Sequence, residues 1–164
     1  MSASKDIGTR AETGIVTYVR TLGFPHADRL ALRGSADAGD IRLTAGLTAG
    51  IIIEVKAGAA AKNASDAQIQ AWVQETDREQ RQAGAEFGFL VTARNGYSPR
   101  RPGLWWVHTD LGTLQRLTSP AAWAMSDMHL EPFRVRLTLD HLLALLRLSG
   151  WGDPMTEPTE ELAR

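Results

Sequence analysis

Two short apolar segments, separated by one amphipathic segment, constrain the fold more than any other feature of this sequence. Residues 51–56, IIIEVK, and residues 87–93, FGFLVTA, have the length and the branched or aromatic content of buried β-strands. Between them, residues 67–83 carry apolar side chains at helical spacing, preceded by Ser65 and Gln68 in the pattern of a capping box. A strand, a helix and a strand in this order predict a right-handed crossover with two parallel strands.

The other segments predict an α/β fold with a mixed central sheet flanked by helices. Apolar residues at spacings of three and four predict a first helix, and three strands joined by short turns predict a meander that ends in the strand 51–56. The elements expected besides the crossover are a helix over residues 7–22, strands over 29–34, 41–43, 104–108 and 133–137, and a leucine-rich final helix that ends near Gly150.

The length and residue content bound the class of protein. With 164 residues, 43% of them hydrophobic, we expect a single domain over residues 1–150 and a flexible acidic tail over residues 151–164. No apolar run approaches the roughly 18 residues of a membrane helix, and the amino end lacks a signal-peptide pattern, so we expect a cytoplasmic protein without a membrane partner. The absence of cysteine excludes thiolate zinc sites, and the absence of a G-x-x-x-x-G-K-[ST] motif argues against a nucleotide cofactor.

The charge distribution remains compatible with a DNA enzyme. The net charge of −1 argues against a protein that coats nucleic acid by bulk attraction. However, residues 1–101 carry 13 Lys and Arg against 11 Asp and Glu, whereas residues 102–164 carry 5 against 8. Metal binding by carboxylates in the first part would make that part more basic still.

The strand 51–56 ends in an unusual pair of charged residues. Alternate side chains of a strand share a face, so Glu54 and Lys56 lie opposite Ile53 and Val55. Burying such charges unpaired costs roughly several kcal/mol, so they need solvent, a partner or a metal ion. An ordinary salt bridge at the sheet edge is the simplest interpretation of this pair taken alone.

Asp40 offers a second carboxylate for the same end of the sheet. It begins the strand 41–43, which a glycine-containing hairpin connects to the strand of Glu54. Two such carboxylates repel unless a cation lies between them, and Mg²⁺, with Mn²⁺ as a substitute, prefers oxygen ligands such as these and the Val55 carbonyl. Beside the metal, Lys56 would orient or deprotonate a water and stabilise charge on a phosphate, which is the chemistry of phosphodiester hydrolysis.

Glu12 is a third candidate carboxylate. It lies on the first predicted helix beside the apolar face, from which it would lean over the end of the sheet. Taken alone, this residue is better explained by a solvated position near a helix N-terminus, which the helix macrodipole favours.

Four segments together resemble a known superfamily. They are GTRAETGIVTYVRTLGF, LRGSADAGDI, IIIEVKAG and FGFLVTARNG, which lie between residues 8 and 96. They resemble the PD-(D/E)XK nuclease superfamily, and within it the archaeal-type and phage Holliday junction resolvases. The resemblance implies a restriction-endonuclease-like core and a Mg²⁺-dependent endodeoxyribonuclease that hydrolyses phosphodiester bonds at four-way DNA junctions. It would act in DNA recombination and repair in a bacterial or phage-infected cell.

The resemblance also implies roles for individual residues. Glu12 would be the helix carboxylate, Asp40 and Glu54 the metal ligands, and Lys56 the catalytic lysine. Val55 would add its carbonyl oxygen to the metal site.

This sequence departs from the superfamily pattern at one position. Gly39 stands where the pattern names proline, and Asp37 competes with Asp40 for the role of metal aspartate. We prefer Asp40 because it directly precedes an apolar strand residue.

The resemblance further implies a homodimer whose two sites cut opposed strands of a junction. Candidates for the dimer interface are Trp105, Trp106 and the leucines of the last helix, although the sequence favours the core for all of them. The expected DNA contacts, for which a solvated position is the alternative, are Arg33, Ser35, Lys62, Arg94, Arg100 and Arg101.

Two other functions fit the same residues. One is a related restriction or repair endonuclease with another DNA target, and the other is a noncatalytic structure-specific DNA-binding module.

Overall fold

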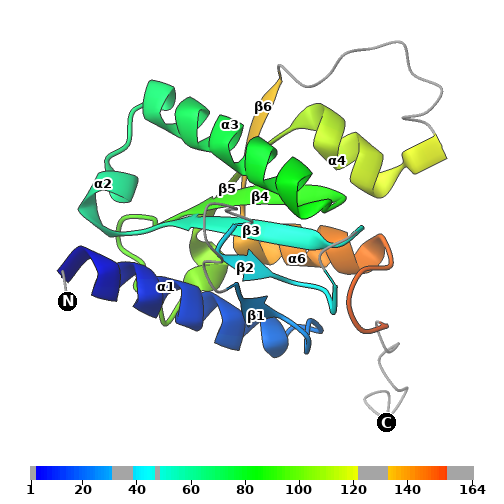
Figure 1. The fold of residues 1–164 in the computed structure, drawn as a ribbon, viewed down its shortest axis with the longest axis horizontal. Coiled ribbons are helices and arrows are strands. Elements are labelled where there is room, and N and C mark those ends of the chain that lie inside the picture. The colour runs from blue at the N-terminus through cyan, green and yellow to red at the C-terminus, as the bar shows by residue number, and fades with distance from the viewer. Residues whose placement is uncertain (1–2, 31–38, 47–48, 122–132, 155–164) are drawn as a thin grey trace, which may run out of the picture.

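The computed structural model describes residues 3–30, 39–46, 49–121 and 133–154, which form a six-stranded sheet flanked by helices (Figure 1). Within these ranges, no helix combines the length and the apolar character needed to cross a membrane. The elements in chain order are α1 (Ala3–Arg20), β1 (Asp28–Arg29), β2 (Ile41–Arg42), β3 (Ile51–Lys56), α2 (Gly58–Lys62), α3 (Asp66–Ala83), β4 (Phe87–Thr92), the 3-10 helix η1 (Pro102–Leu104), β5 (Trp106–Asp110), α4 (Leu111–Thr118), β6 (Arg134–Thr138) and α6 (Leu139–Leu148).

The sheet is mixed, as the sequence predicts, and its strands lie in chain order from β1 to β6. The first three strands form an antiparallel meander. β3 and β4 are parallel and are joined through α3, whereas β4, β5 and β6 are antiparallel to their neighbours. The expectation of an α/β fold with a mixed sheet flanked by helices is therefore confirmed.

α3 is held close to the sheet by its ends and by one glycine. The Ser65 hydroxyl accepts a hydrogen bond from the backbone N–H of Gln68 at 3.3 Å, and the helix ends at Gly84, whose φ is 63°. Gly88 lies on β4 beneath the helix, where a Cβ would come within 2.9 Å of the Cβ of Gln80. This close approach brings side chains of α3 within reach of β3.

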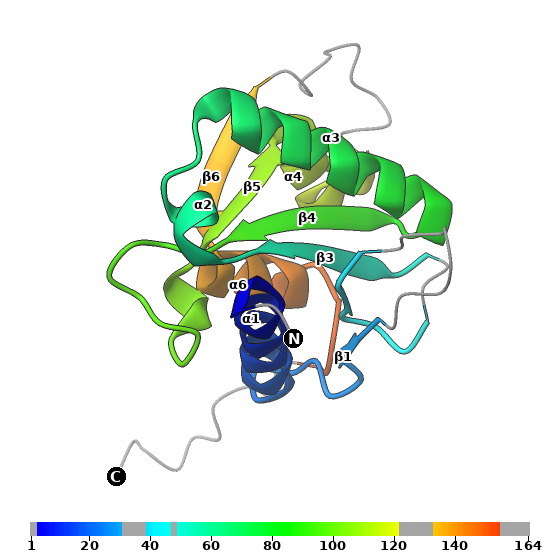
Figure 2. The same ribbon diagram turned by 60° about the vertical axis from the view of Figure 1, so that its left-hand side comes forward.

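The two faces of the sheet carry different chemistry. One face presents Ile51, Ile53 and Val55 of β3 to the main core, which α1 and α6 cover (Figure 2). Burying a side chain of this size stabilises the fold by about 1.5–3 kcal/mol. The other face presents Glu54 and Lys56 toward α3. The charged pair therefore lies in the smaller, more polar of the two layers.

Several elements differ from the sequence expectation. Two helices, α2 and α4, are additional to the predicted elements. α2, with the sequence GAAAK, is too short to show a periodic pattern. α4 is capped by Asp110, whose carboxylate accepts a hydrogen bond from the backbone N–H of Thr113 at 2.7 Å. β5 begins two residues later than predicted because Trp105 turns into the core, where its indole N–H donates to the Tyr97 carbonyl at 3.2 Å. The core interpretation of Trp105 is thus confirmed.

The described part of the expected tail packs against the fold. The Trp151 ring meets the Phe87 ring edge-on with centroids 5.9 Å apart, and the backbone N–H of Asp153 donates to the Gly23 carbonyl at 2.7 Å. The rest of the expected tail, residues 155–164, lies outside the described residues, as do residues 31–34 of the first expected strand.

Candidate active site

Asp40 extends the pairing of β2 with β3 by a side-chain contact. Its backbone N–H donates to the Ile53 carbonyl at 3.1 Å, and its Oδ2 accepts a hydrogen bond from the backbone N–H of Val55 at 2.8 Å. Because Ile41 pairs with Ile53, the preceding residue lies across from Glu54. Asp40 and Glu54 therefore lie at the same end of the sheet, where β2 begins, as the hairpin predicts.

The turn into Asp40 requires a glycine. Gly39 has a φ of 84°, in the left-handed region that L side chains rarely adopt. Proline, whose φ is fixed near about −65°, is excluded there. The departure from the superfamily pattern at this position thus has a backbone reason.

The Val55 carbonyl faces the same side as Asp40. The N–H and C=O of one strand residue point to the same neighbouring strand, and the Val55 N–H points to Asp40. The next residue points the other way, since the Lys56 carbonyl accepts from the backbone N–H of Ala93 beyond β4 at 2.9 Å. Asp40, Glu54 and the Val55 carbonyl thus present oxygen atoms around one end of β3.

Burial and nearby negative charges raise the pKa of both carboxylates. Burial raises the pKa of Asp40 to about 7, and the charges of Glu54 and Glu12 add to the rise against the Val55 hydrogen bond. Burial also raises the pKa of Glu54, although Lys56 opposes the rise. Each carboxylate is therefore costly to ionise without a nearby cation.

Lys56 is held by two carboxylates. Its Nζ lies 2.7 Å from Glu54 Oε1 and 3.2 Å from Glu75 Oε2. Burial alone would lower the pKa of Lys56, but these two partners outweigh burial and raise it above its ordinary value. Lys56 is therefore an ammonium group at neutral pH, which fits orientation and charge stabilisation rather than proton abstraction.

Glu12 reaches the site from α1 with a partner of its own. Its Oε2 accepts from Arg29 Nε at 2.7 Å and lies 2.5 Å from Arg29 Nη2. The Glu12 side chain is only 16% exposed, and its charge acts on Asp40. It thus lies at the margin of the group, beside the sheet, with its charge compensated by Arg29.

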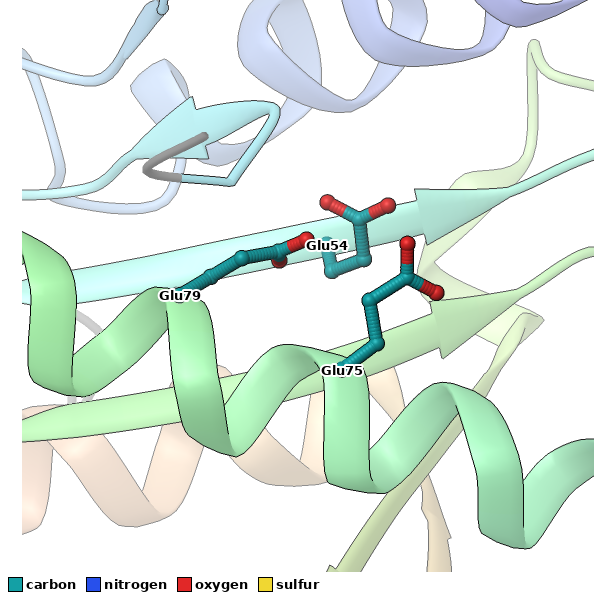
Figure 3. Close-up of side chains that lie close together, drawn as sticks. All are labelled: Glu54, Glu75 and Glu79. Carbon is teal, nitrogen blue, oxygen red and sulfur yellow. The ribbon is translucent and has the colours of Figure 1, made fainter. Parts of the chain in front are cut away.

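Two further glutamates, which the sequence did not single out, face Glu54 from α3 (Figure 3). One carboxylate oxygen from each of Glu54, Glu75 and Glu79 lies within 4.8 Å of the others, so this group also has the composition of a cation site. Glu79 is buried at 3% exposure. The sequence could have pointed to Glu79 through its position, because Glu79 follows Thr76 by three residues and so lies on the apolar stripe of the helix.

Some of the basic residues expected to contact DNA lie around this end of the sheet. Lys62 and Arg100 line a groove of about 1110 Å³ together with Arg10 of α1 and Ala57, which directly follows Lys56. We call it the α1 groove. Arg101 lies over the Tyr97 ring at 5.4 Å. Arg94 lies over the same Tyr97 ring at 4.8 Å and also over the Trp106 ring at 3.9 Å. The expected contacts Arg33 and Ser35, and the alternative ligand Asp37, lie outside the described residues.

Comparison with known proteins identifies no relative of this chain. No family model, curated protein or solved structure matches this chain. The functional assignment therefore rests on the geometry of Asp40, Glu54 and Lys56.

Proposed function

We propose that this protein is a metal-dependent DNA endonuclease, specifically a Holliday junction resolvase. The observation that carries the proposal is the arrangement of Asp40, Glu54 and Lys56 at the end of β3. The buried Glu54 and the half-buried Asp40 lie on neighbouring strands at the same end of the sheet, and an ammonium group lies 2.7 Å from the Glu54 carboxylate. A purely structural salt bridge does not require the second carboxylate, whose pKa is raised to about 7.

The residues present fit a hard divalent cation such as Mg²⁺ or Mn²⁺. Asp40 keeps lone pairs beyond the one that accepts from Val55, and Glu54 keeps an oxygen beyond the one that binds Lys56. Together with the Val55 carbonyl they form an all-oxygen set, which suits Mg²⁺. When bound, the cation would neutralise phosphate charge and lower the pKa of a bound water.

Each residue of the candidate site then has a distinct role. Asp40 and Glu54 provide the carboxylates that would hold the cation, and the Val55 N–H fixes the orientation of Asp40. Lys56, kept protonated by Glu54 and Glu75, stabilises negative charge that develops on the phosphate. Glu12 adds negative potential from the margin and is oriented by Arg29.

The α1 groove supports a DNA path to this site. Its described lining includes Arg10, Lys62 and Arg100 and no carboxylate, and it adjoins Lys56 through Ala57 and Gly58. Cations along an open groove suit the phosphates of a DNA strand. In the proposed homodimer, two such sites would make the paired cuts that resolution of a junction needs.

The test is cleavage of a labelled four-way junction and of a linear duplex with matched arm sequence, in Mg²⁺ and in EDTA. Wild-type protein should make paired, metal-dependent cuts in the junction, and the isosteric Glu54→Gln variant should lose them. Lys56→Ala should retain DNA binding and cut at least about 100-fold more slowly, as expected when one charge-stabilising group is removed. Glu86→Gln, an exposed glutamate outside this site, is the matched control for Glu54→Gln.

Other outcomes select the alternatives. Equal cutting of junction and duplex would indicate a restriction or repair endonuclease with another target. Tight junction binding without cutting in any divalent metal would contradict the enzyme and favour a DNA-binding module in which Lys56 and its two carboxylates are structural.

A further inference from the structure

Residues of the N-terminal part of α3 and of strands β5 and β6 line a second groove. In the ribbon view, α3 covers the face of the sheet opposite α1 and α6 (Figure 2). The volume of the groove is about 740 Å³. Four basic residues line it: Lys62, Arg94, Arg134 and Arg136. We call it the β6 groove. The two β6 arginines have no role in the candidate active site described above.

The register of the sheet gathers these residues. His108 pairs with Arg136, and Asp110 pairs with Arg134, so both arginines share the face of the sheet that carries Trp106 and His108. The guanidinium carbon of Arg94 lies 3.9 Å from the centroid of the Trp106 ring, and that of Arg136 lies 4.6 Å from it. Stacking on the indole holds the planar groups while leaving N–H donors at their edges for an anion.

The positive charge of the groove is only partly compensated. Among its described lining residues, Asp66 is the one carboxylate, and Asp77 of α3 and Asp110 of β5 lie near Arg134. Burial raises the pKa of Asp77, and the charge of Arg134 opposes that rise. His108 is uncharged at neutral pH, because burial and the charge of Arg136 lower its pKa to about 4. Its Nε2 is engaged with the Thr92 hydroxyl at 2.9 Å. The net surface offered to a ligand is therefore cationic, with an aromatic floor.

The β6 groove is separate from the candidate active site and yet connected to the α1 groove. β6 lies three strands from β3 in the sheet order, which corresponds to roughly 14 Å at the usual strand spacing of about 4.8 Å. Lys62 and Ala93 line both grooves. Cationic residues thus continue from the α1 groove past α2 to the exposed strand β6.

We propose that the β6 groove binds the phosphate backbone of a second DNA segment, while a first segment lies at the Asp40–Glu54 site. This inference rests on the proposed function and deepens it. A linear duplex presents one segment near the site, whereas a four-way junction presents further arms at its centre. The β6 groove thereby gives the protein its preference for branched over linear DNA.

The same arginines have a simpler explanation, which the test must separate. β6 is an edge strand of the described sheet, and charged side chains on an edge strand prevent pairing with other chains. If that were their whole role, their removal would promote self-association and leave DNA binding unchanged.

The experiment measures binding of labelled junction and linear duplex in EDTA by fluorescence anisotropy, so that cutting does not interfere. The test variant is Arg134→Gln/Arg136→Gln. The control is Arg78→Gln/Arg81→Gln, which removes the same charge from exposed arginines of α3 outside both grooves. Circular dichroism and thermal melting establish that both variants are folded, and light scattering reports self-association.

We expect the test variant to bind the junction about tenfold more weakly, with the slope of log Kd against log salt reduced by about 2, as for two lost phosphate contacts. Its affinity for linear duplex should change much less, and the control should resemble wild type. Equal losses for junction and duplex, equal losses in test and control, or self-association with unchanged DNA binding would each overturn the inference.

Failure of the inference is distinguishable from failure of the proposed function. If wild type cuts junctions and the test variant binds them like the control, the proposed function stands and the β6 groove has no such role. If the test variant selectively loses junction binding but wild type never cuts, the groove assignment stands and the nuclease assignment fails. If wild type binds no DNA, both fail.

Discussion

Asp40 Oδ2 accepts a hydrogen bond from the backbone N–H of Val55 at 2.8 Å, beside the point where β2 begins. This contact fixes the Asp40 carboxylate against β3, next to Glu54 in the strand. Removing the charge of Asp40 while keeping an acceptor oxygen should therefore separate the metal-binding role of Asp40 from its role in the fold.

Asp40→Asn should remain folded and lose metal-dependent stabilisation. For wild type at pH 7.5, Mg²⁺ at ten times its Kd should stabilise the fold by about 1.4 kcal/mol, measured as a rise in melting temperature over that in EDTA. Asp40→Asn should show little or none of this rise. A rise of wild-type size would show that Asp40 is not a ligand.

Glu79→Gln is the comparison that locates the cation. Glu79 belongs to the Glu54–Glu75–Glu79 group but not to the Asp40–Glu54 pair. The variant should keep its Mg²⁺-dependent rise in melting temperature. If Glu79→Gln loses the rise and Asp40→Asn keeps it, the cation lies among the α3 glutamates instead.

Gly39→Ala should destabilise the protein by about 1–2 kcal/mol, because a side chain at a φ of 84° is strained. The added Cβ would also lie 3.2 Å from Ile52 Cδ1. Urea unfolding measures the change in free energy. Gly46→Ala is the control, since a Cβ there meets nothing within 4 Å, and it should change stability by less than about 0.5 kcal/mol. Equal effects of the two substitutions would contradict the backbone explanation.

Glu75→Gln should lower the pKa of Lys56, because the charge and hydrogen bond of Glu75 both raise it. Nitrogen-15 NMR of the lysine side chains can follow this titration, since the chain contains only Lys5, Lys56 and Lys62. Glu86→Gln removes the same charge from an exposed position and should leave Lys56 unchanged. An unshifted Lys56 in Glu75→Gln would mean that the 3.2 Å contact is not maintained in solution.

The metal-free protein should lose a contribution to stability as the pH rises from about 4 to about 7. The pKa of Asp40 is raised from 3.8 to about 7, and that of Glu54 is raised as well, so the folded state holds protons that the unfolded state releases. Their stabilising contribution is fully present below pH 3.8 and is lost as the pH passes 7. Unfolding free energies at pH 5 and pH 7.5 in EDTA should show this loss in wild type and less of it in Asp40→Asn.

His108 contributes with the opposite sign over an overlapping range. Its pKa is lowered from 6.5 to about 4, so the unfolded state takes up a proton that the folded state refuses. Its contribution is present above pH 6.5 and is lost as the pH falls through 4. His108→Gln should therefore reduce the loss of stability on acidification between pH 6.5 and 4. An unchanged pH profile would indicate that His108 is accessible to water in the folded state.

The sequence by itself determined the crossover that builds the centre of the fold. The length and composition of residues 51–56 and 87–93, and the capped helix between them, suffice for two parallel strands because each signal is local. The glycine-containing hairpin also predicted that Asp40 and Glu54 reach the same end of the sheet, whereas the structure supplied the register that pairs Ile41 with Ile53. The sequence did not predict α2, because five residues are too few to show a helical period.

Only the tertiary structure decided which charges meet across distant elements. The contact of Glu75 with Lys56 depends on how closely α3 approaches β4, which Gly88 permits. The approach of Arg94 and Arg136 to the Trp106 ring depends on the register of β4, β5 and β6. Sequence periodicity specifies which face of an element is apolar, but the packing of distant elements sets which polar side chains come within reach of one another.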